Sequence, residues 1–294
     1  MGTMANTRPV LPPKKAVLLR LLSELNRPVT NAEFQALLFL FTKRHRKQAL
    51  PSLNYDFVPH RLGAYSFTCA ADKFYLMKRR MLKRDEKHWE LTRHGLATAQ
   101  VCPPLMGLKD FVHRQGRLGL PRLLSDQYCL HPFYATRSTI LERVLPDLNY
   151  RKYVIRARAP QRAGGLIVRS NKYSSLETTI NKLLENSVTL LCDLRPATVP
   201  TPSLLEIAWQ SMGLRCERFS ELNHAPETAG ALDLFERKTM DRRNRLLAPL
   251  AKFMSAGFRP ALICGCADEK SCRSQRVARV LTIRTGDAWD TLRV

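Results

Sequence analysis

The chain has 294 residues, of which 45% are hydrophobic and 25% are charged, and this composition excludes an intrinsically disordered protein. It contains 48 Lys and Arg residues against 25 Asp and Glu residues, which gives a formal net charge of +23. This excess disfavours an enzyme of small metabolites and favours a partner with dense negative charge, such as DNA, RNA or an anionic membrane.

The sequence predicts neither a membrane span nor an exported protein. The longest uninterrupted apolar run covers residues 36–41, whereas a spanning helix needs about 20 apolar residues. The N-terminal sequence MGTMANTRPVLPPKK lacks the apolar segment of a secretory signal. The eight cysteines lack the spacing of a disulfide scaffold and indicate a reducing compartment. We therefore expect a cytoplasmic protein whose partner is a nucleic acid.

The N-terminal third is predicted to contain three helices and a short pair of strands. Leucines recur at helical spacing over residues 14–25, and Thr30 with Glu33 forms a capping box for a second helix. A third helix is expected over about 68–82, and the alternation of residues 88–92 predicts a strand. Three helices followed by a strand pair are typical of a winged helix, whose basic helix ends can approach phosphates.

Basic residues are concentrated at the ends of the second and third predicted helices. A solvated cationic surface is the simpler interpretation of such runs, but the net charge of +23 favours contacts with DNA phosphates. Residues 14–145 would then form a winged-helix domain with a helical extension, followed by a basic linker over 146–165. The predicted phosphate-binding residues of this domain are Lys43, Arg44, Arg46, Lys47, Lys78, Arg79, Arg80, Lys83 and Arg84.

Residues 166–294 alternate short apolar runs with helical segments, which indicates a parallel sheet with right-handed crossovers. The fold class expected for the chain is therefore α/β, with a winged-helix domain followed by a Rossmann-like parallel-sheet domain. No GxGxxG or GxxxxGK(S/T) motif occurs, so no nucleotide cofactor is predicted. Strands are expected at 166–169, 188–192, 214–219 and 260–264. The first two helices are expected to begin at the capping box 174–177 and at Thr201-Pro202, and two more are expected over about 231–256 and from Ser271 to Leu281.

Candidate catalytic residues follow the predicted strand 188–192, because sites in open parallel sheets form beyond the carboxyl ends of strands. As a catalytic group, Asp193 would be kept ionised by Arg195 and would stabilise an oxocarbenium-like sugar or orient a water. As a structural group, it would cap a turn or pair with Arg195. A metal-dependent nuclease needs further carboxylates, and only Glu221 and Asp268 lie near other strand ends.

A second polar segment follows the strand 260–264 and contains Cys264, Cys266 and Cys272. Their C-x-C-x5-C spacing lacks the paired sets of most zinc sites, so no metal is predicted. A nucleophilic thiolate at Cys272 and simple core packing are the two other interpretations. Arg273 and Arg276, at the start of the following helix, indicate a pocket for a DNA phosphate.

These motifs resemble two known families. Residues 165–282, with Asp193-x-Arg195 and the three spaced cysteines, resemble the family called domain of unknown function 488, although Arg273-Ser274 stands where His-Arg is usual. The segments FQALLFLF, YDFVPHRLGAYSF and LTRHG resemble YwgA-type winged-helix proteins. The two resemblances together imply a DNA-directed role in bacterial genome defence.

Three functions of different classes remain open on these grounds. The first is an anti-phage DNA glycosylase that hydrolyses the N-glycosidic bond of a modified base, with the Asp193 carboxylate stabilising the sugar charge or positioning a water. The second is a metal-dependent nuclease, and the third is a non-catalytic winged-helix regulator that senses a nucleotide or modified DNA. Binding to tRNA or to the ribosome shares the charge argument. The expected partner is double-stranded DNA, with no cofactor and no membrane.

Overall fold

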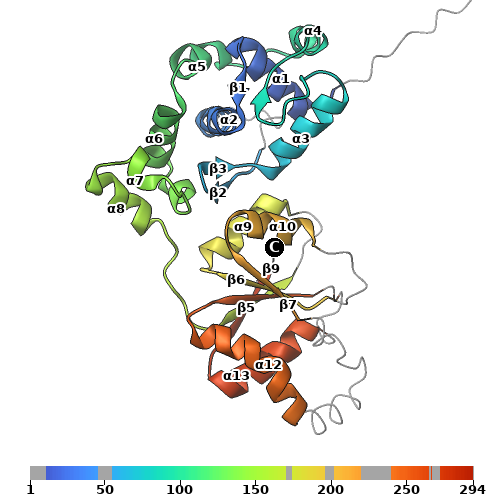
Figure 1. Ribbon diagram of the computed structural model, residues 1–294, viewed down its shortest axis with the longest axis vertical. Helices are drawn as coiled ribbons and strands as arrows, with labels where there is room; N and C mark the ends of the chain where they lie inside the picture. Colours follow the sequence, from blue (N-terminus) through green and yellow to red (C-terminus); the bar gives the residue numbers. More distant parts are fainter. Residues whose placement is uncertain are drawn as a thin grey trace, which may run out of the picture. The chain divides into compact units, whose positions relative to one another are not determined.

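A computed structural model divides the chain into two compact units, Met1–Ala157 and Arg158–Val294 (Figure 1). The boundary between them falls within the predicted linker. The structure describes residues 11–45, 55–169, 174–195, 202–219, 240–264, 266 and 272–293. Among them it contains both helices and a five-stranded parallel sheet, so the predicted α/β class is confirmed.

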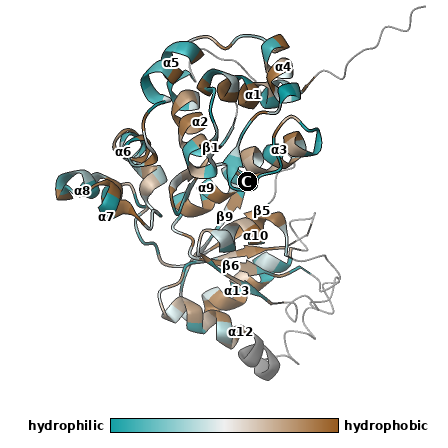
Figure 2. Cartoon of the chain, turned by 45° about the horizontal axis from the view of Figure 1, so that its top comes forward, coloured by the Kyte–Doolittle hydropathy of each residue, from teal (hydrophilic) through white to brown (hydrophobic). Residues whose placement is uncertain are grey.

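The first unit begins with helices in the predicted order, but it also contains β1 and a β2–β3 hairpin before the third helix, which the sequence did not predict. Residues 34–42 of the second helix are all buried, so this helix forms the centre of the unit and is hydrophobic along most of its length (Figure 2). The elements are α1 (Pro13–Leu25), β1 (Val29–Thr30), α2 (Asn31–His45), β2 (Val58–His60), β3 (Gly63–Tyr65), α3 (Phe67–Lys78), β4 (His88–Trp89) and α4 (Arg93–Val101).

Local signals determine where α2 and α3 begin and end. The backbone N–H of Glu33 donates to Thr30 Oγ1 over 3.3 Å, as the predicted cap requires, but the Glu33 carboxylate pairs with Arg27. Helix α3 ends four residues before the predicted Leu82, because Arg80 adopts a left-handed φ of +57°. Met81 N then bonds to Leu76 O, which closes the helix with a Schellman motif.

Short antiparallel pairings hold the segment after α3 against the helices. Val29 of β1 pairs with Trp89 of β4, and Leu82 forms an isolated antiparallel bridge with Leu91. The Trp89 indole stacks on the Phe34 ring with centroids 4.0 Å apart, which anchors this strand pair to α2. The strand predicted within residues 88–92 is therefore confirmed.

The remainder of the first unit is helical and extends into the predicted linker. Asp147 caps the last helix, since its Oδ1 accepts a hydrogen bond from Asn149 N over 2.7 Å. Val154 of that helix is fully buried, so the first half of the predicted linker 146–165 is ordered structure. The elements are α5 (Leu108–Gln115), α6 (Leu120–Leu130), the 3₁₀ turn η3 (Pro132–Ala135), α7 (Leu141–Val144) and α8 (Leu148–Arg156).

The second unit is a parallel sheet with helices on both faces. The strand order is β7-β6-β8-β5-β9, with α9 and α10 on one face and α12 and α13 on the other (Figure 1). The four predicted strands are confirmed, whereas the edge strand β9 is missing from the prediction. The elements are β5 (Gly165–Arg169), α9 (Leu176–Glu185), β6 (Leu190–Asp193), α10 (Leu204–Ser211), β7 (Arg215–Arg218), α12 (Met240–Ser255), β8 (Pro260–Ile263), α13 (Arg273–Thr285) and β9 (Trp289–Arg293).

The described helix starts of the second unit differ from the predictions by one or two residues. Ser175, not Ser174, caps α9, and its Oγ accepts from Thr178 N over 3.0 Å. Helix α10 begins after Ser203 rather than at Thr201-Pro202. Cys272 stands at the N-cap of α13, while the predicted cap Ser271 and the helical residues predicted over 231–239 lie outside the described residues.

Two glycines of the predicted linker, Gly165 at the start of β5 and Gly164 just before it, stand where the chain at the start of β9 comes too close for a side chain. Gly164 has φ +78°, and a Cβ there would lie 1.9 Å from the Ala288 carbonyl oxygen. A Cβ on Gly165 would lie 2.3 Å from the Trp289 ring. These contacts let β9 pack directly against the start of β5.

Replacement of Gly164 by alanine is expected to lower the free energy of unfolding by roughly 2–4 kcal/mol, because backbone strain and a steric clash add. Gly213 has a similar φ of +74°, but a Cβ there would meet no atom within 4 Å, so this position reports the strain alone. Its replacement by alanine is expected to cost only about 1–2 kcal/mol. Urea unfolding of both variants measures the difference, and equal losses would contradict the close contact at Ala288.

Candidate functional site

The carboxyl ends of β6 and β8 bring the two predicted polar segments to the same edge of the sheet. Asp193 pairs in register with Ile263, and Leu194 N donates to Ile263 O over 2.8 Å. Cys264 follows Ile263 directly, so the Asp193 segment and the cysteine segment lie on adjacent central strands. This placement agrees with the prediction that both segments follow parallel strands.

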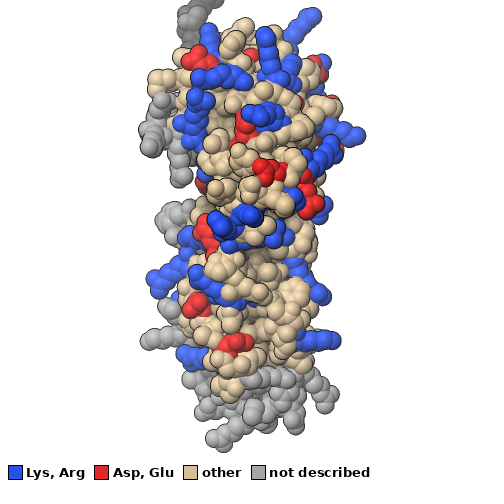
Figure 3. Space-filling model, turned by 90° about the vertical axis from the view of Figure 1, so that its left-hand side faces the viewer, with Lys and Arg blue, Asp and Glu red and all other residues tan. Residues whose placement is uncertain are grey.

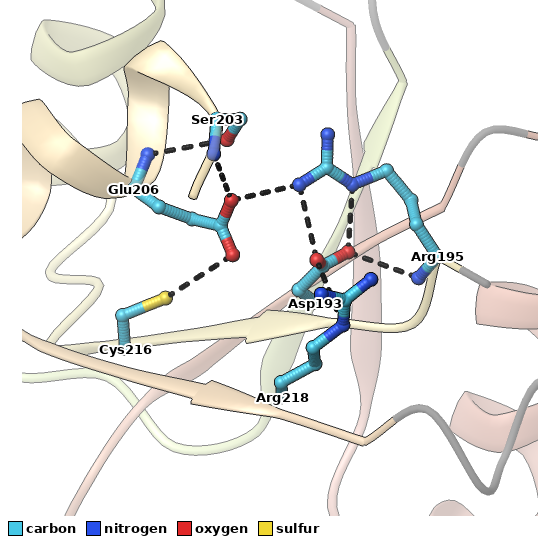
Figure 4. A network of polar contacts seen from close by, with 6 residues as sticks. All are labelled: Asp193, Arg195, Ser203, Glu206, Cys216 and Arg218. Carbon is cyan, nitrogen blue, oxygen red and sulfur yellow. Dashed lines mark hydrogen bonds and ion pairs between the residues drawn. The ribbon is translucent and has the colours of Figure 1, made fainter. Parts of the chain in front are cut away.

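Asp193 is enclosed by Arg195 (Figure 4). Its Oδ1 accepts hydrogen bonds from Arg195 N at 2.9 Å and Nε at 2.8 Å, while its Oδ2 accepts from Nη2 at 3.0 Å. Arg218 adds an ion pair, with Nε 3.8 Å from Oδ2. The Asp193 side chain is only 1% exposed, so neither carboxylate oxygen faces solvent.

A second buried carboxylate completes this network. Arg195 Nη2 also donates to Glu206 Oε2 over 2.8 Å, so one guanidinium bridges two acids. Glu206 is at the same time the third residue of the Ser203 capping box, which begins α10. Cys216 Sγ lies 3.9 Å from Glu206 Oε1 (Figure 4). The network therefore ties the end of β6 to the start of α10 and to β7.

The electrostatics of this network stabilise the ionised form of Asp193. Burial by itself raises the pKa of Asp193, but the hydrogen bonds and charge of Arg195 outweigh it and hold the pKa below its usual value. The hydrogen bond with Asp193 raises the pKa of Arg195. Since Asp193 is ionised but saturated with donors and shielded from solvent, the geometry favours its structural interpretation, a turn held by Arg195.

Sequence reasoning missed Ser203, Glu206, Cys216 and Arg218 as members of this network. The Ser-x-x-Glu pattern at 203–206 is a capping-box signal and would have placed Glu206 at the start of α10. No comparable signal marks Cys216 or Arg218, because their membership depends on the pairing of β7 with β6.

The three cysteines of the second segment converge on one point. Their sulfur atoms all lie within 4.8 Å of one another, and Cys264 Sγ is 3.4 Å from Cys272 Sγ. Cys272 is buried, whereas Cys264 and Cys266 are half-buried. The backbone N–H of Arg273, in the first turn of α13, donates to Cys266 Sγ over 3.5 Å. We call Cys264, Cys266 and Cys272 the thiol cluster.

The thiols of this cluster influence one another's protonation. The hydrogen bond from Cys272 lowers the pKa of Cys264, against the opposing effect of burial, and the same contact raises the pKa of Cys272. Burial raises the pKa of Cys266, while the N–H of Arg273 acts in the opposite direction. Within this pair the contact favours a thiolate at Cys264, whereas the sequence offered Cys272 as one candidate nucleophile.

Arg273 and Arg276, the predicted phosphate ligands, lie in the first turn of α13 next to the thiol cluster. Both side chains are half-buried. Glu221 and Asp268, the further carboxylates considered for a nuclease, lie outside the described residues.

The predicted basic residues of the first unit have different environments. Lys43 is held by the protein itself, because its Nζ donates to Tyr134 Oη over 3.0 Å and lies 5.4 Å from the Phe39 ring centroid. These contacts hold the Lys43 ammonium group beside Tyr134, and its assignment as a phosphate ligand stays a prediction. Arg46 and Lys47 lie outside the described residues. The exposed members of the predicted set are Arg44, Lys78, Arg79, Arg80, Lys83 and Arg84.

Five of these exposed residues lie within residues 78–84, which cover the end of α3 and one side of the Leu82–Leu91 bridge. Lys87 and Arg93 are also exposed there and were missed, although both flank the predicted strand 88–92. We call this group the basic surface, formed by Lys78, Arg79, Arg80, Lys83, Arg84, Lys87 and Arg93. Positive charge is not confined to it, since Figure 3 shows Lys and Arg among fewer acidic side chains on the visible side of each unit.

A scan against known protein families finds no family model that matches the chain, and a search of curated proteins also finds no match. Within the described residues, no helix combines the length and the apolar character needed to cross a membrane.

Proposed function

We propose that the chain is a DNA-binding regulator that contacts duplex DNA through the basic surface. The observation that carries this proposal is the position of that surface, at the end of a helix and on the adjoining antiparallel segment. Helix ends and strand loops with exposed Lys and Arg are the parts of small DNA-binding folds that contact phosphates.

The order of elements supports a winged-helix interpretation of the first unit. Helices α1, α2 and α3 precede the antiparallel bridge between Leu82 and Leu91, and β1 pairs with β4 as a further strand. In this interpretation α3 is the recognition helix. Ala71, Phe74 and Lys78 are exposed at helical spacing on α3, with Phe74 53% exposed, and such residues can contact thymine methyl groups and phosphates.

The backbone at the end of α3 supports a functional reason for its charges. Arg80 occupies the left-handed position that closes the helix, where glycine would avoid a strain of about 1–2 kcal/mol. A basic residue at a strained and exposed position is consistent with a role in binding rather than in folding.

The network around Asp193 supports a regulator over a glycosylase or a nuclease. Both enzymatic hypotheses need the Asp193 carboxylate to reach a substrate, a water or a metal ion. With 1% exposure and both oxygens bound by Arg195, Asp193 has no route to any of these unless the network opens. The sheet unit then contributes a binding or sensing surface at its strand ends.

One experiment tests the proposal against its alternatives. The purified chain is titrated against plain duplex DNA, phage-modified duplex DNA, single-stranded DNA and tRNA at several salt concentrations, and binding is followed by fluorescence anisotropy. We expect duplex binding to be tightest and to weaken steeply with salt. The same mixtures are assayed for freed bases, abasic sites and nicks, with and without a chelator. Released base from modified DNA would establish the glycosylase instead, and chelator-sensitive nicks would establish the nuclease.

A further inference from the structure

We propose that the thiol cluster binds one soft divalent metal ion, such as Zn²⁺, at the carboxyl edge of the sheet. This proposal does not depend on duplex binding by the basic surface. It differs from the expectation drawn from the cysteine spacing, which was that no metal is bound. Cys264 and Cys266 are separated from Cys272 by too many residues for a short zinc motif. In the structure, Cys272 at the N-cap of α13 nevertheless lies beside the two earlier thiols.

The sulfur geometry fits a single ion. Zinc–thiolate bonds of about 2.3 Å in a tetrahedral arrangement place neighbouring sulfur atoms about 3.8 Å apart. The Cys264 and Cys272 sulfur atoms are 3.4 Å apart, and no pair in the cluster is separated by more than 4.8 Å. Changes of about 1 Å or less in these separations would therefore bring the three sulfur atoms to zinc-ligand distances.

The surroundings of the cluster complement the charge of a metal thiolate centre. Three thiolates around Zn²⁺ carry a net charge of −1, which the positive end of the α13 dipole stabilises. The backbone N–H of Arg273 already donates to Cys266 Sγ, the kind of outer hydrogen bond that orients a metal ligand. Arg273 and Arg276 add two cationic residues to the same helix turn.

Two other uses of the thiols account for fewer of these observations. A disulfide between Cys264 and Cys272 would require the sulfur atoms to approach from 3.4 Å to about 2.05 Å and would leave Cys266 without a role. Packing alone accounts for the buried Cys272 but not for the convergence of the half-buried Cys264 and Cys266 on the same point.

The ligand set defines the class of site. Among the described residues, no further His, Cys, Asp or Glu joins the three cysteines. Three protein ligands with water or an exogenous ligand in the fourth position is the arrangement of zinc sites that bind or activate molecules. An anionic ligand at that position would also face the cationic start of α13, which suits a phosphate or carboxylate group.

Metal binding is tested on the full chain in the absence of DNA, so failure of this proposal and failure of DNA binding are distinguishable. Reduced, metal-free protein is incubated with Zn²⁺, desalted and analysed for its metal content. The same protein loaded with Co²⁺ is examined by absorption spectroscopy. We expect one equivalent of Zn²⁺, a sulfur-to-cobalt charge-transfer band and a higher melting temperature in the loaded protein.

Serine variants identify the ligands. Cys266→Ser removes a half-buried thiol and is expected to disturb folding least. The variants Cys264→Ser, Cys272→Ser and the triple variant are measured beside it. Each is expected to weaken zinc affinity more than about tenfold, since even outer-shell changes cost that much. The control, Cys102→Ser/Cys129→Ser, lies in the other unit and should bind zinc like the unmodified chain. Equal zinc binding by the Cys266→Ser variant and the unmodified chain, or a metal-free chain with a Cys264–Cys272 disulfide, would overturn the proposal.

Discussion

Replacement of Lys78, Arg79, Arg80 and Arg84 together by glutamine is expected to weaken duplex DNA binding by roughly a hundred- to a thousand-fold at moderate salt. Each neutralised phosphate contributes about 0.9 to the slope of log affinity against log salt concentration. Loss of four such contacts should therefore lower the magnitude of the slope by about 3 to 4. The four side chains are exposed, so their replacement leaves the packed interior of the unit unchanged.

A matched control separates local contacts from the general attraction of a chain with a net charge of +23. Arg114, Arg117, Arg122 and Arg143 are also exposed and lie in the same unit, from α5 to α7. Their replacement by glutamine removes the same charge and should change affinity by less than about tenfold. Anisotropy titrations over a range of salt concentrations compare the two variants. Equal losses would show that DNA binding is diffuse and has no preferred surface.

Replacement of Arg195 by methionine is expected to lower the free energy of unfolding of the sheet unit by roughly 3–5 kcal/mol. Arg195 holds both Asp193 and Glu206, whose side chains are 1% and 6% exposed. Without the guanidinium, two neighbouring carboxylates remain buried, and only the longer ion pair of Asp193 with Arg218 is left to offset their charge. Methionine keeps most of the apolar side-chain stem, so lost packing contributes little.

The pH dependence of stability tests the same network through Asp193. Its folded-state pKa is lowered relative to the unfolded value of about 3.9. The ion pair therefore stabilises the fold above about pH 4, and the stabilisation is lost as the pH falls from there through the folded-state pKa. In Asp193→Asn the loss should already be present at neutral pH, and the acid limb of the stability curve should be flatter.

Urea unfolding of Asp193→Asn, Arg195→Met and the double variant from pH 3 to pH 8 measures these effects. The double variant should be more stable than the sum of the single losses predicts, because it leaves fewer unpaired charges. A catalytic Asp193 makes a different prediction, since Asp193→Asn would then keep its stability and lose only base release. That result would restore the glycosylase interpretation.

The strands of the sheet unit could be predicted from the sequence because burial on both faces requires a continuous apolar run. Leu190, Leu191 and Cys192 are fully buried as this pattern indicates. The edge strand β9 could not be predicted in the same way. Its sequence WDTLR is mostly exposed and polar, and only pairing with β5 and the glycines at 164 and 165 make it a strand.

The residue types of the candidate site could also be identified from the sequence, but their roles could not. The pattern Asp-x-Arg at 193–195 shows a carboxylate beside a guanidinium, and Glu206, eleven positions after Arg195, makes the pair part of a buried network. Lys43 likewise belongs to a basic run, yet its ammonium group donates a hydrogen bond to Tyr134 Oη. In both cases the deciding partner comes from a separate element.

The sequence by itself therefore determined the fold class, the position of most strands and helices, and the excess of positive charge, since these depend on local periodicity and composition. Only the tertiary structure decided that Asp193 is enclosed, that Lys43 is packed and that three separated cysteines share one point. The physical reason is that a polar atom's role depends on whether its neighbour is water, an opposite charge or another ligand atom. That neighbour comes from an element far away in the sequence, so it is known only once the tertiary fold is known.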